Sequence, residues 1–336
     1  MVLGKKVMDE VSGWLTVFED GSVDRTWTGP PEVKFMSDPV PQHRHFVDGV
    51  AVADVNSDQE SGLKLRIYLP QKVQDDDDHD SQKLPILLHF HGGGFCISQA
   101  DWYMYYAVYT ALARAARAVV VSVYLRRAPE HRLPAACDDG LAALHWLRSV
   151  ARGEAQEPWL KEHADLGRVF LIGDSSGGNI VHHVAASAGQ EDLSVAGAIP
   201  IHPGFCRAKR SKSELEQPET PFLTIAMMDK FLSLALPEGA TKDHPICCPM
   251  GEAAPPLEKL KLPPYLYCIA EQDLMLDTEM EFYEAMKMAK KDVELLVSHG
   301  VGHSFYLNKI AVDMDPHVSA QTQLLFQRIK LFIQNH

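Results

Sequence analysis

The chain has 336 residues, of which 46% are hydrophobic and 23% charged, so it can bury the core of one large domain or of two small ones. Its net charge of −13 would repel a nucleic-acid backbone or an anionic membrane surface, and we expect neither as a partner. No stretch approaches the roughly 20 apolar residues that cross a bilayer, and the first ten residues lack the apolar run of a secretory signal.

The N-terminal quarter is predicted to form a hairpin, a strand and an acidic loop. Asp20-Gly21 separates two short β-prone runs within residues 14–25, which is typical of a hairpin. Residues 66–69 are predicted to form a further strand. Residues 75–80 contain five aspartates, whose repulsion favours a solvated loop. A calcium site is less favoured there, because the run lacks the glycine and distal glutamate of a calcium-binding loop.

Short apolar segments then alternate with helical ones. The predicted strands span residues 84–90, 118–125, 168–172, 195–201, 264–269 and 293–297. The predicted helices span residues 104–117, 138–152, 178–188, 278–290 and 320–333. This alternation indicates an α/β fold with a mostly parallel sheet and helices on both faces. We therefore expect a single domain over residues 1–336.

Two segments fall outside the alternation. One is the N-terminal stretch to about residue 41, and the other is an insert at about residues 206–250. Within the insert, residues 224–236 are apolar nearly all round, so a helix there must be covered on more than one side. We expect both segments to form a cap over the carboxyl edge of the sheet. An additional core helix is the alternative for 224–236.

The pentapeptide Gly173-Asp174-Ser175-Ser176-Gly177 lies between a predicted strand and a predicted helix. In Gly-X-Ser-X-Gly hydrolases this sharp turn presents the serine hydroxyl at the end of the strand, and the glycines avoid clashes in the turn. Ser175 is therefore the predicted nucleophile. Ser176 lies beside the apex, so we expect its N–H rather than its hydroxyl to act in catalysis.

A second glycine-rich motif, His91-Gly92-Gly93-Gly94-Phe95, also follows a strand. Consecutive glycines let backbone N–H groups approach a substrate oxygen, which stabilises a tetrahedral oxyanion. We predict an oxyanion hole formed by Gly93, Gly94 and the N–H of Ser176. An ordinary glycine-rich turn is the alternative.

A base and its orienting acid should follow the serine in the order acid, then histidine. Asp273 and His303 each lie just beyond a predicted strand, where α/β active sites collect. We predict Asp273 as the acid and His303 as the base. Asp277 resembles the start of a helix instead, and His299 is a rival base two residues past its strand.

Together these motifs make the chain resemble the plant carboxylesterases, within the hormone-sensitive-lipase-like α/β-hydrolases. The resemblance implies an eight-stranded, mostly parallel sheet, a helical cap and ester hydrolysis without a cofactor. Residues 124–127 depart from the usual family pattern, which leaves the packing around Glu130 open. The family also includes hormone receptors that lack the histidine and dehydratases that eliminate water. The presence of Ser175 and His303 favours ester hydrolysis over both alternatives.

No phosphate loop, dinucleotide motif or histidine set with metal-ligand spacing occurs in the sequence, so we expect no cofactor and no metal. Six scattered cysteines favour reduced, buried thiols and a cytoplasmic location. The expected substrates are small soluble carboxylic esters, because the sequence offers no apolar or basic surface for a lipid interface. No obligate protein partner is evident.

Overall fold

The computed structural model describes residues 5–57, 62–72 and 83–336, so the acidic run at 75–80 lies outside the described residues. Its main sheet has nine strands, one more than the resemblance implies. In order across the sheet they are β12 (Val293–Ser298), β11 (Tyr265–Ala270), β10 (Gly197–Ile201), β9 (Ala164–Asp174), β7 (Leu84–Phe90), β8 (Val119–Val123), β6 (Lys64–Pro70), β5 (Val50–Asn56) and β4 (His43–Val47).

The strand directions confirm a mostly parallel sheet. The six strands from β12 to β8 run parallel, whereas β6, β5 and β4 pair antiparallel. The parallel strands are nearly continuous runs of buried apolar residues because helices cover both faces. β9 begins at Ala164, four residues before the predicted start, since its polar beginning pairs with Leu84 through the backbone.

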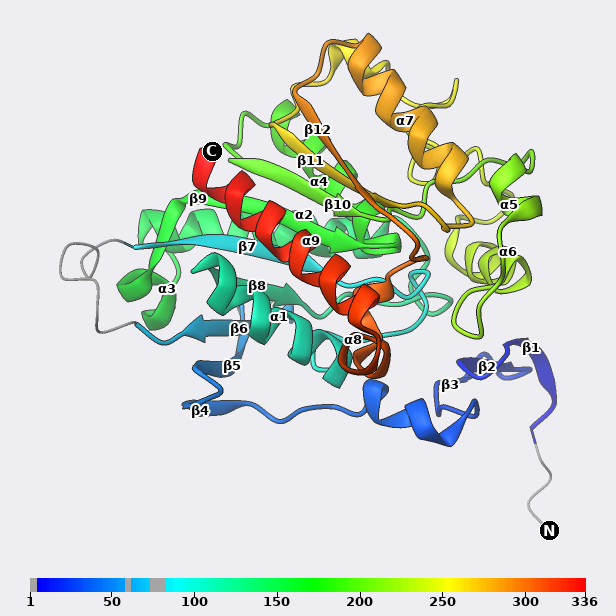
Figure 1. Ribbon diagram of the computed structural model, residues 1–336, viewed down its shortest axis with the longest axis horizontal. Coiled ribbons are helices and arrows are strands. Elements are labelled where there is room, and N and C mark those ends of the chain that lie inside the picture. Colours follow the sequence, from blue (N-terminus) through cyan, green and yellow to red (C-terminus); the bar gives the residue numbers. More distant parts are fainter. Residues whose placement is uncertain (1–4, 58–61, 73–82) are drawn as a thin grey trace.

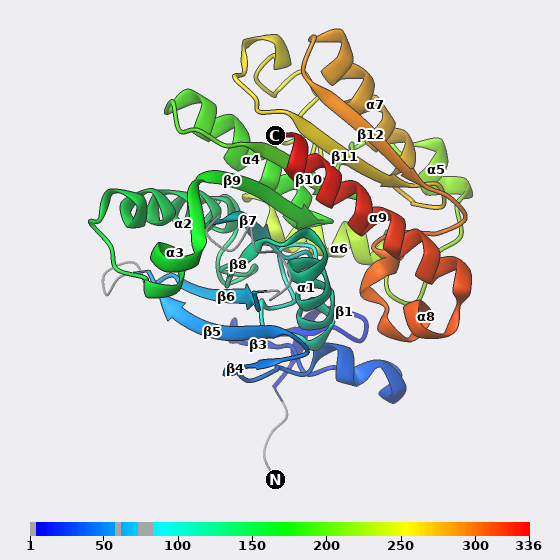
Figure 2. The ribbon, with the colours of Figure 1, turned by 60° about the vertical axis from the view of Figure 1, so that its left-hand side comes forward.

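The helices form two layers around this sheet (Figures 1 and 2). One layer contains α1 (Tyr103–Ala116) and α9 (Pro316–Asn335), which pack on each other. The opposite layer contains α2 (Ala135–Arg152), α4 (Ser176–Gln190) and α7 (Leu276–Met288), with the short α3 (Pro158–His163) near β9. Each layer has its own apolar core, so the sheet is buried on both faces.

The N-terminal segment forms a separate small antiparallel sheet and a 3₁₀ helix. The small sheet contains β1 (Val7–Val11), β2 (Leu15–Phe18) and β3 (Val23–Asp24), and β2 and β3 are joined through the predicted Asp20-Gly21 turn. The 3₁₀ helix η1 (Pro31–Ser37) follows, ahead of β4.

One arginine attaches this segment to the main domain. The Arg25 guanidinium donates hydrogen bonds to the carbonyls of Cys96 and Ala128 and to both carboxylate oxygens of Glu130. Glu130, whose packing the sequence left open, is therefore the acidic partner of the N-terminal arm.

The insert between β10 and β11 contains α5 (Lys212–Glu216) and α6 (Ile225–Ala235). Thr224 caps α6 by accepting a hydrogen bond from the N–H of Met227, which explains why the helix begins there. Lys230 of α6 pairs with Asp9 of β1 at 2.6 Å. The insert and the N-terminal segment therefore lie against each other, at the lower right of the molecule in Figure 1.

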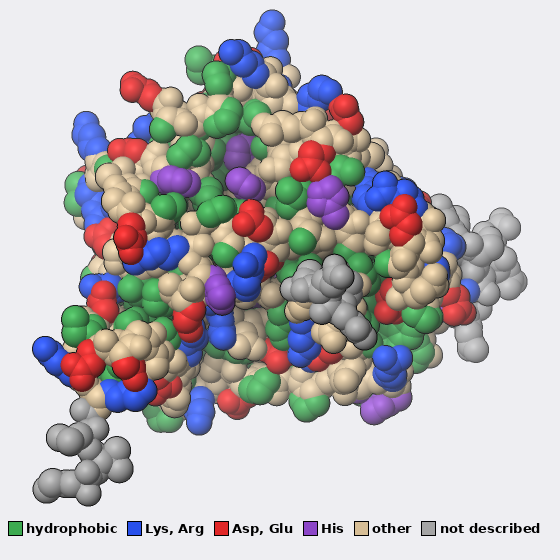
Figure 3. Space-filling model, turned by 180° about the vertical axis from the view of Figure 1, so that it is seen from behind, with side chains coloured by type: hydrophobic (Ala, Val, Ile, Leu, Met, Phe, Trp, Pro, Cys, Tyr) green, Lys and Arg blue, Asp and Glu red, His purple; other side chains and the backbone are tan. Residues whose placement is uncertain are grey.

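Across the described part of the chain, no helix combines the length and apolar character needed to span a membrane. The face opposite the view of Figure 1 carries acidic and basic side chains interspersed with one another (Figure 3). All six cysteines are buried free thiols, as their scattered spacing predicts.

Candidate active site

Ser175 lies at a sharp turn between β9 and α4. Its backbone has φ 51° and ψ −125°, a conformation that L residues rarely adopt, and its N–H donates to the carbonyl of Ile201 on the neighbouring strand. A Cβ atom on Gly177 would lie 2.0 Å from the carbonyl oxygen of Phe90, so only glycine lets α4 start this close to β7. The local sequence therefore produces the strained turn that the motif requires.

The glycine loop after β7 lies against this turn. Gly93 and Gly94 have φ values of +101° and +58°, which favour glycine. A Cβ atom on Gly94 would lie 2.5 Å from the Phe231 ring of α6, so the loop also contacts the insert. The Ser176 hydroxyl accepts a hydrogen bond from the N–H of Phe95 at 3.2 Å. This bond holds the loop beside the N-terminus of α4, so the three predicted oxyanion donors come from adjoining segments.

A buried polar cluster beneath the loop was not predicted from the sequence. Asp174 accepts hydrogen bonds from the N–H of Gly92 at 3.3 Å and from the Tyr105 hydroxyl at 3.4 Å. His89 Nε2 lies 3.7 Å from the same carboxylate, and burial lowers the pKa of His89. These contacts fix the loop relative to the serine. Asp174 occupies the variable second position of the Gly-X-Ser-X-Gly motif. The sequence gave no sign of its contacts, because the partner residues are distant along the chain.

The predicted acid and base meet at the carboxyl ends of β11 and β12. Asp273 is fully buried; its Oδ2 lies 2.6 Å from His303 Nδ1, and its Oδ1 accepts from the N–H of Met275. Burial alone would raise the pKa of Asp273, but the charge of His303 and the hydrogen bond with His303 Nδ1 hold this pKa below its usual value. Burial likewise disfavours protonated His303, but Asp273 outweighs it and raises the pKa of His303.

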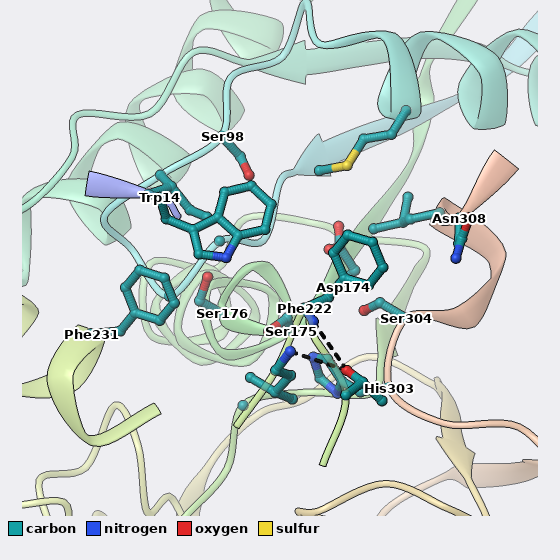
Figure 4. A pocket seen from close by; sticks show the side chains of 18 of the residues that line it. Trp14, Ser98, Asp174, Ser175, Ser176, Phe222, Phe231, His303, Ser304 and Asn308 are labelled. Atoms are coloured by element: carbon teal, nitrogen blue, oxygen red, sulfur yellow. Dashed lines mark hydrogen bonds between the residues drawn. The ribbon is translucent and has the colours of Figure 1, made fainter. Parts of the chain in front are cut away.

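The other ring nitrogen of His303, Nε2, is buried and has no hydrogen-bond partner among the described residues. Ser175 and His303 line one cavity, and Figure 4 shows their side chains close together. The Ser175 hydroxyl is thus a candidate partner for Nε2. Catalytic hydrogen bonds of this kind commonly tighten only when substrate is bound.

His202 positions the turn that carries His303. Its Nδ1 accepts a hydrogen bond from the N–H of Ser304 at 2.9 Å, and Ser304 has the left-handed φ of 49°. Because His202 is fully buried, its pKa falls to about 3 and the ring stays neutral, as this acceptor role requires. His202 is therefore a hydrogen-bonded structural histidine beside the candidate base.

The two rival candidates lie elsewhere. Asp277 accepts a hydrogen bond from the N–H of Ser213 at 2.8 Å, so it connects α7 to the insert. The His299 side chain is 69% exposed, and its Nδ1 lies 3.6 Å from Glu271. Neither contacts His303 in the described structure, which leaves Asp273 and His303 as the paired residues.

Glu279, in the first turn of α7, is a second buried carboxyl group near Asp273. It is fully buried, and neither carboxyl oxygen has a hydrogen-bond partner among the described residues. Burial, with a smaller contribution from the negative charge of Asp273, raises its pKa well above the usual value. A neutral Glu279 adds no charge beside Asp273. The sequence gave no sign of it, because an isolated acid in a helical segment is normally exposed.

His202, Asp273 and His303 are also the residues that could hold a metal ion, since they offer ligand atoms within 4.8 Å of one another. Two ligands of one zinc ion lie roughly 3 Å or more apart, because each is about 2 Å from the metal. His303 Nδ1 and Asp273 Oδ2 are only 2.6 Å apart, and His202 Nδ1 already accepts from Ser304. The arrangement is therefore that of a hydrogen-bonded pair and not of a metal centre.

The cavity above Ser175 has a volume of about 460 Å³. Its wall combines the loop after β7, the start of α1, the turn that follows His303, the N-terminal segment and the insert. Five of the side chains around it are labelled in Figure 4 at its edges: Trp14, Phe222, Phe231, Ser304 and Asn308. A volume of this size suits a small organic ligand.

Comparison with known proteins places this geometry in context. A family profile for the α/β hydrolase fold matches residues 87–307. The chain is 36% identical to probable carboxylesterase 6 of Arabidopsis thaliana over 90% of this chain and 85% of that protein. It is also 36% identical to the gibberellin receptor GID1C of the same plant, over 82% and 80% of the two chains.

A third relative is tuliposide A-converting enzyme 1 of Tulipa gesneriana, described as chloroplastic, which is 36% identical over 82% of this chain and 69% of that protein. Among solved structures, an esterase of Pyrobaculum calidifontis superposes with a TM-score of 0.68 at 26% identity, covering 89% of this chain and 87% of that one. Carboxyl esterase 2 of Tuber melanosporum gives 0.71 at 21% identity, over 91% and 95% of the chains, and shows the shared fold.

Proposed function

The chain belongs to the α/β-hydrolase family, and we propose that it is a carboxylesterase that hydrolyses small carboxylic esters with Ser175, His303 and Asp273. The observation that carries this proposal is the state of the His303 ring. Nδ1 is bonded to a buried carboxylate, while Nε2 is unpaired in the cavity that Ser175 also lines. Such a ring is oriented to take a proton at Nε2.

The reaction follows from this geometry. Asp273 accepts a hydrogen bond from Nδ1–H of His303, which leaves the lone pair on Nε2 free to take the proton from Ser175 as the serine oxygen attacks the ester carbonyl carbon. The N–H groups of Gly93, Gly94 and Ser176 would stabilise the resulting oxyanion. Nε2 then returns the proton to the departing alcohol, leaving an acyl-serine. Water, deprotonated by the same nitrogen, hydrolyses this ester and restores the enzyme.

We infer that residues 1–336 form one domain, with cap elements at about 1–41 and 206–250. The ion pair between Lys230 and Asp9 and the cavity-lining residues of both segments support this arrangement. A cap of this kind would restrict the size of the substrate and exclude bulk water from the acyl-enzyme.

The test of this function compares two neighbouring serines. Ser175→Ala should reduce hydrolysis of p-nitrophenyl acetate by roughly 10⁶-fold, because the nucleophile is lost. Ser176→Ala keeps its backbone N–H and loses only the bond from Phe95, so it should retain most activity. An organophosphate should label Ser175 stoichiometrically in wild-type protein. If Ser176→Ala is the inactive variant, the assignment of the nucleophile is wrong.

The same assay separates an esterase from the other activities known among its relatives. A receptor would bind ligand without Ser175-dependent turnover, and a dehydratase would eliminate water from its substrate without releasing an acid. The structure contains the bond between Asp273 and His303 that serine ester hydrolysis uses.

For location and partners, we propose a cytoplasmic protein that needs no nucleic acid, membrane or obligate protein partner. Six free thiols suit a reducing compartment, and the interspersed surface charges in Figure 3 do not resemble a phosphate-binding face. A fluorescent fusion of the full-length protein, imaged in plant cells, tests the location; accumulation in plastids would contradict it.

A further inference from the structure

The lining of the cavity beside Ser175 includes aromatic rings from five segments, together with aliphatic side chains. Its aromatic residues are Trp14, Trp27, Phe95, Trp102, Tyr105, Phe222, Phe231 and Phe305. Trp14 forms the centre of one wall, since it packs edge-on against Trp27 at 4.3 Å and nearly parallel to Trp102 at 6.3 Å. Aromatic walls favour a flat aromatic ligand over a saturated ring of the same size, through edge-to-face and offset stacking.

The charges around the cavity disfavour an anionic ligand. No lysine, arginine or glutamate occurs among the described residues that line it, and its acidic and histidine residues are Asp174 and His303. Asp174 already accepts hydrogen bonds from Gly92 and Tyr105. A ligand carboxylate would therefore meet an apolar wall and a carboxylate without a counter-charge, which is costly. The cavity therefore suits a ligand without a negative charge, and a neutral ester meets this condition.

Besides His303 Nε2, two polar atoms in this apolar wall lack a partner among the described residues. Trp14 Nε1 and Ser304 Oγ are both buried without a hydrogen bond among the described residues. The two side chains lie on opposite sides of the space above Ser175 in Figure 4. Other polar groups of the wall are engaged, since Trp27 Nε1 donates to Pro30 and Ser37 Oγ to Lys34. Buried polar atoms normally have partners, so these two indicate where a ligand supplies them.

We propose that the substrates of this enzyme are neutral aromatic esters that carry a further oxygen substituent on the ring, which bonds to Trp14 Nε1 or Ser304 Oγ. This inference rests on the proposed function, because it names the substrate class of the same site. The cavity wall would then have two functions. The aromatic surfaces select a flat ring, and the two unpaired polar atoms select its substituent.

Binding to the Ser175→Ala variant tests the ring preference without turnover. Calorimetric titration with 2-phenylethyl acetate and 2-cyclohexylethyl acetate compares two ligands with the same ester and the same linker. The phenyl ligand should bind about threefold to tenfold more tightly. A merely apolar cavity would favour the cyclohexyl ligand, since it buries more apolar surface. Equal or tighter binding of the cyclohexyl ligand overturns the proposal.

A ring hydroxyl tests the two polar atoms. In the same variant, 2-(4-hydroxyphenyl)ethyl acetate should bind about threefold to tenfold more tightly than the unsubstituted phenyl ligand. Adding Trp14→Phe or Ser304→Ala should abolish that gain for at least one of the two positions. The matched controls Trp27→Phe and Ser37→Ala remove polar atoms that already have partners, so the gain should persist. No gain in the parent variant, or its loss in the controls alone, overturns the proposal.

Turnover by the wild-type enzyme distinguishes this inference from the function on which it rests. Acetate release from all three esters with no preference for the aromatic ones would overturn the inference and leave the esterase intact. Aromatic selectivity in binding with no Ser175-dependent acetate release would overturn the proposed function, and with it the assignment of these compounds as substrates. Preferential release from the hydroxylated ester is the result that supports both.

Discussion

Replacing Asp273 by asparagine is the change that most directly tests the proposed mechanism. The substitution keeps the size of the side chain but removes the charge that orients the His303 ring at 2.6 Å. The asparagine amide can also donate to Nδ1, which places the imidazole proton on Nε2. A protonated Nε2 has no free lone pair and cannot accept the proton of Ser175. A wrong tautomer of this kind costs about 10⁴-fold in kcat, or about 5.4 kcal/mol of transition-state stabilisation.

The pH profile provides a second, independent readout of the same change. His303 accepts the Ser175 proton only when it is neutral, so kcat/KM should fall as the pH drops through the His303 pKa. In the wild type Asp273 raises that pKa above the usual 6.5, so the acid limb should lie above pH 6.5. In Asp273→Asn burial, which lowers the His303 pKa, is opposed only by the charge of Asp174, so the residual activity should show its acid limb at lower pH.

Steady-state hydrolysis of p-nitrophenyl acetate between pH 5 and 9 measures both effects. Asp277→Asn is the matched control, because it lies in the same loop and helix start but bonds to Ser213 of the insert. An asparagine oxygen can still accept that bond, so activity should stay within about threefold of wild type. Equal losses in the two variants, or an unchanged acid limb in Asp273→Asn, would refute the assignment of the orienting acid.

Three further changes test the oxyanion loop, the N-terminal arm and the cavity. Gly94→Ala should lower kcat/KM by about 10²-fold, because its Cβ would lie 2.5 Å from the Phe231 ring and displace an oxyanion donor; near-wild-type turnover by folded protein would argue against this loop. Arg25→Ala should lower the free energy of unfolding in urea by about 2 kcal/mol, because the Arg25 side chain is only 12% exposed and bonds to Glu130 and two carbonyls. The control Lys5→Ala should change it by less than about 0.5 kcal/mol. Equal effects would show that Arg25 does not specifically attach the N-terminal segment to the main domain. Across a p-nitrophenyl ester series, rates should fall from butyrate to palmitate because the cavity is bounded by the insert and the N-terminal segment; rates that rise towards palmitate would show that these segments do not close it.

Much of the geometry of the candidate site could be predicted because its signals are local. A strand, a glycine-flanked serine and a helix occupy consecutive residues, so Ser175 is identifiable without knowledge of the rest of the fold. Asp273 and His303 follow from strand ends in the same way. Their meeting requires only that parallel strands end at one edge of the sheet.

The supporting contacts could not be predicted because each joins segments far apart in sequence. Nothing near Arg25 indicates Glu130, and nothing near Asp174 indicates Tyr105. The additional edge strand β4 was missed for a similar reason. Its residues are mostly exposed and polar, so backbone pairing with β5 rather than an apolar pattern defines it.

The turns at the strand ends of the core supply the proposed reacting groups, whereas two tryptophans and two phenylalanines of the cavity wall come from the N-terminal segment and the insert. Residues 14–37 and 220–232 are therefore the two segments that a mutational library for substrate preference should vary. Recombination of these two segments between related proteins would exchange binding preferences while the nucleophile, base and oxyanion loop stay unaltered. Specificity within such a family can thus diversify through these two segments, provided that the contact between Phe231 and the Gly94 loop is kept.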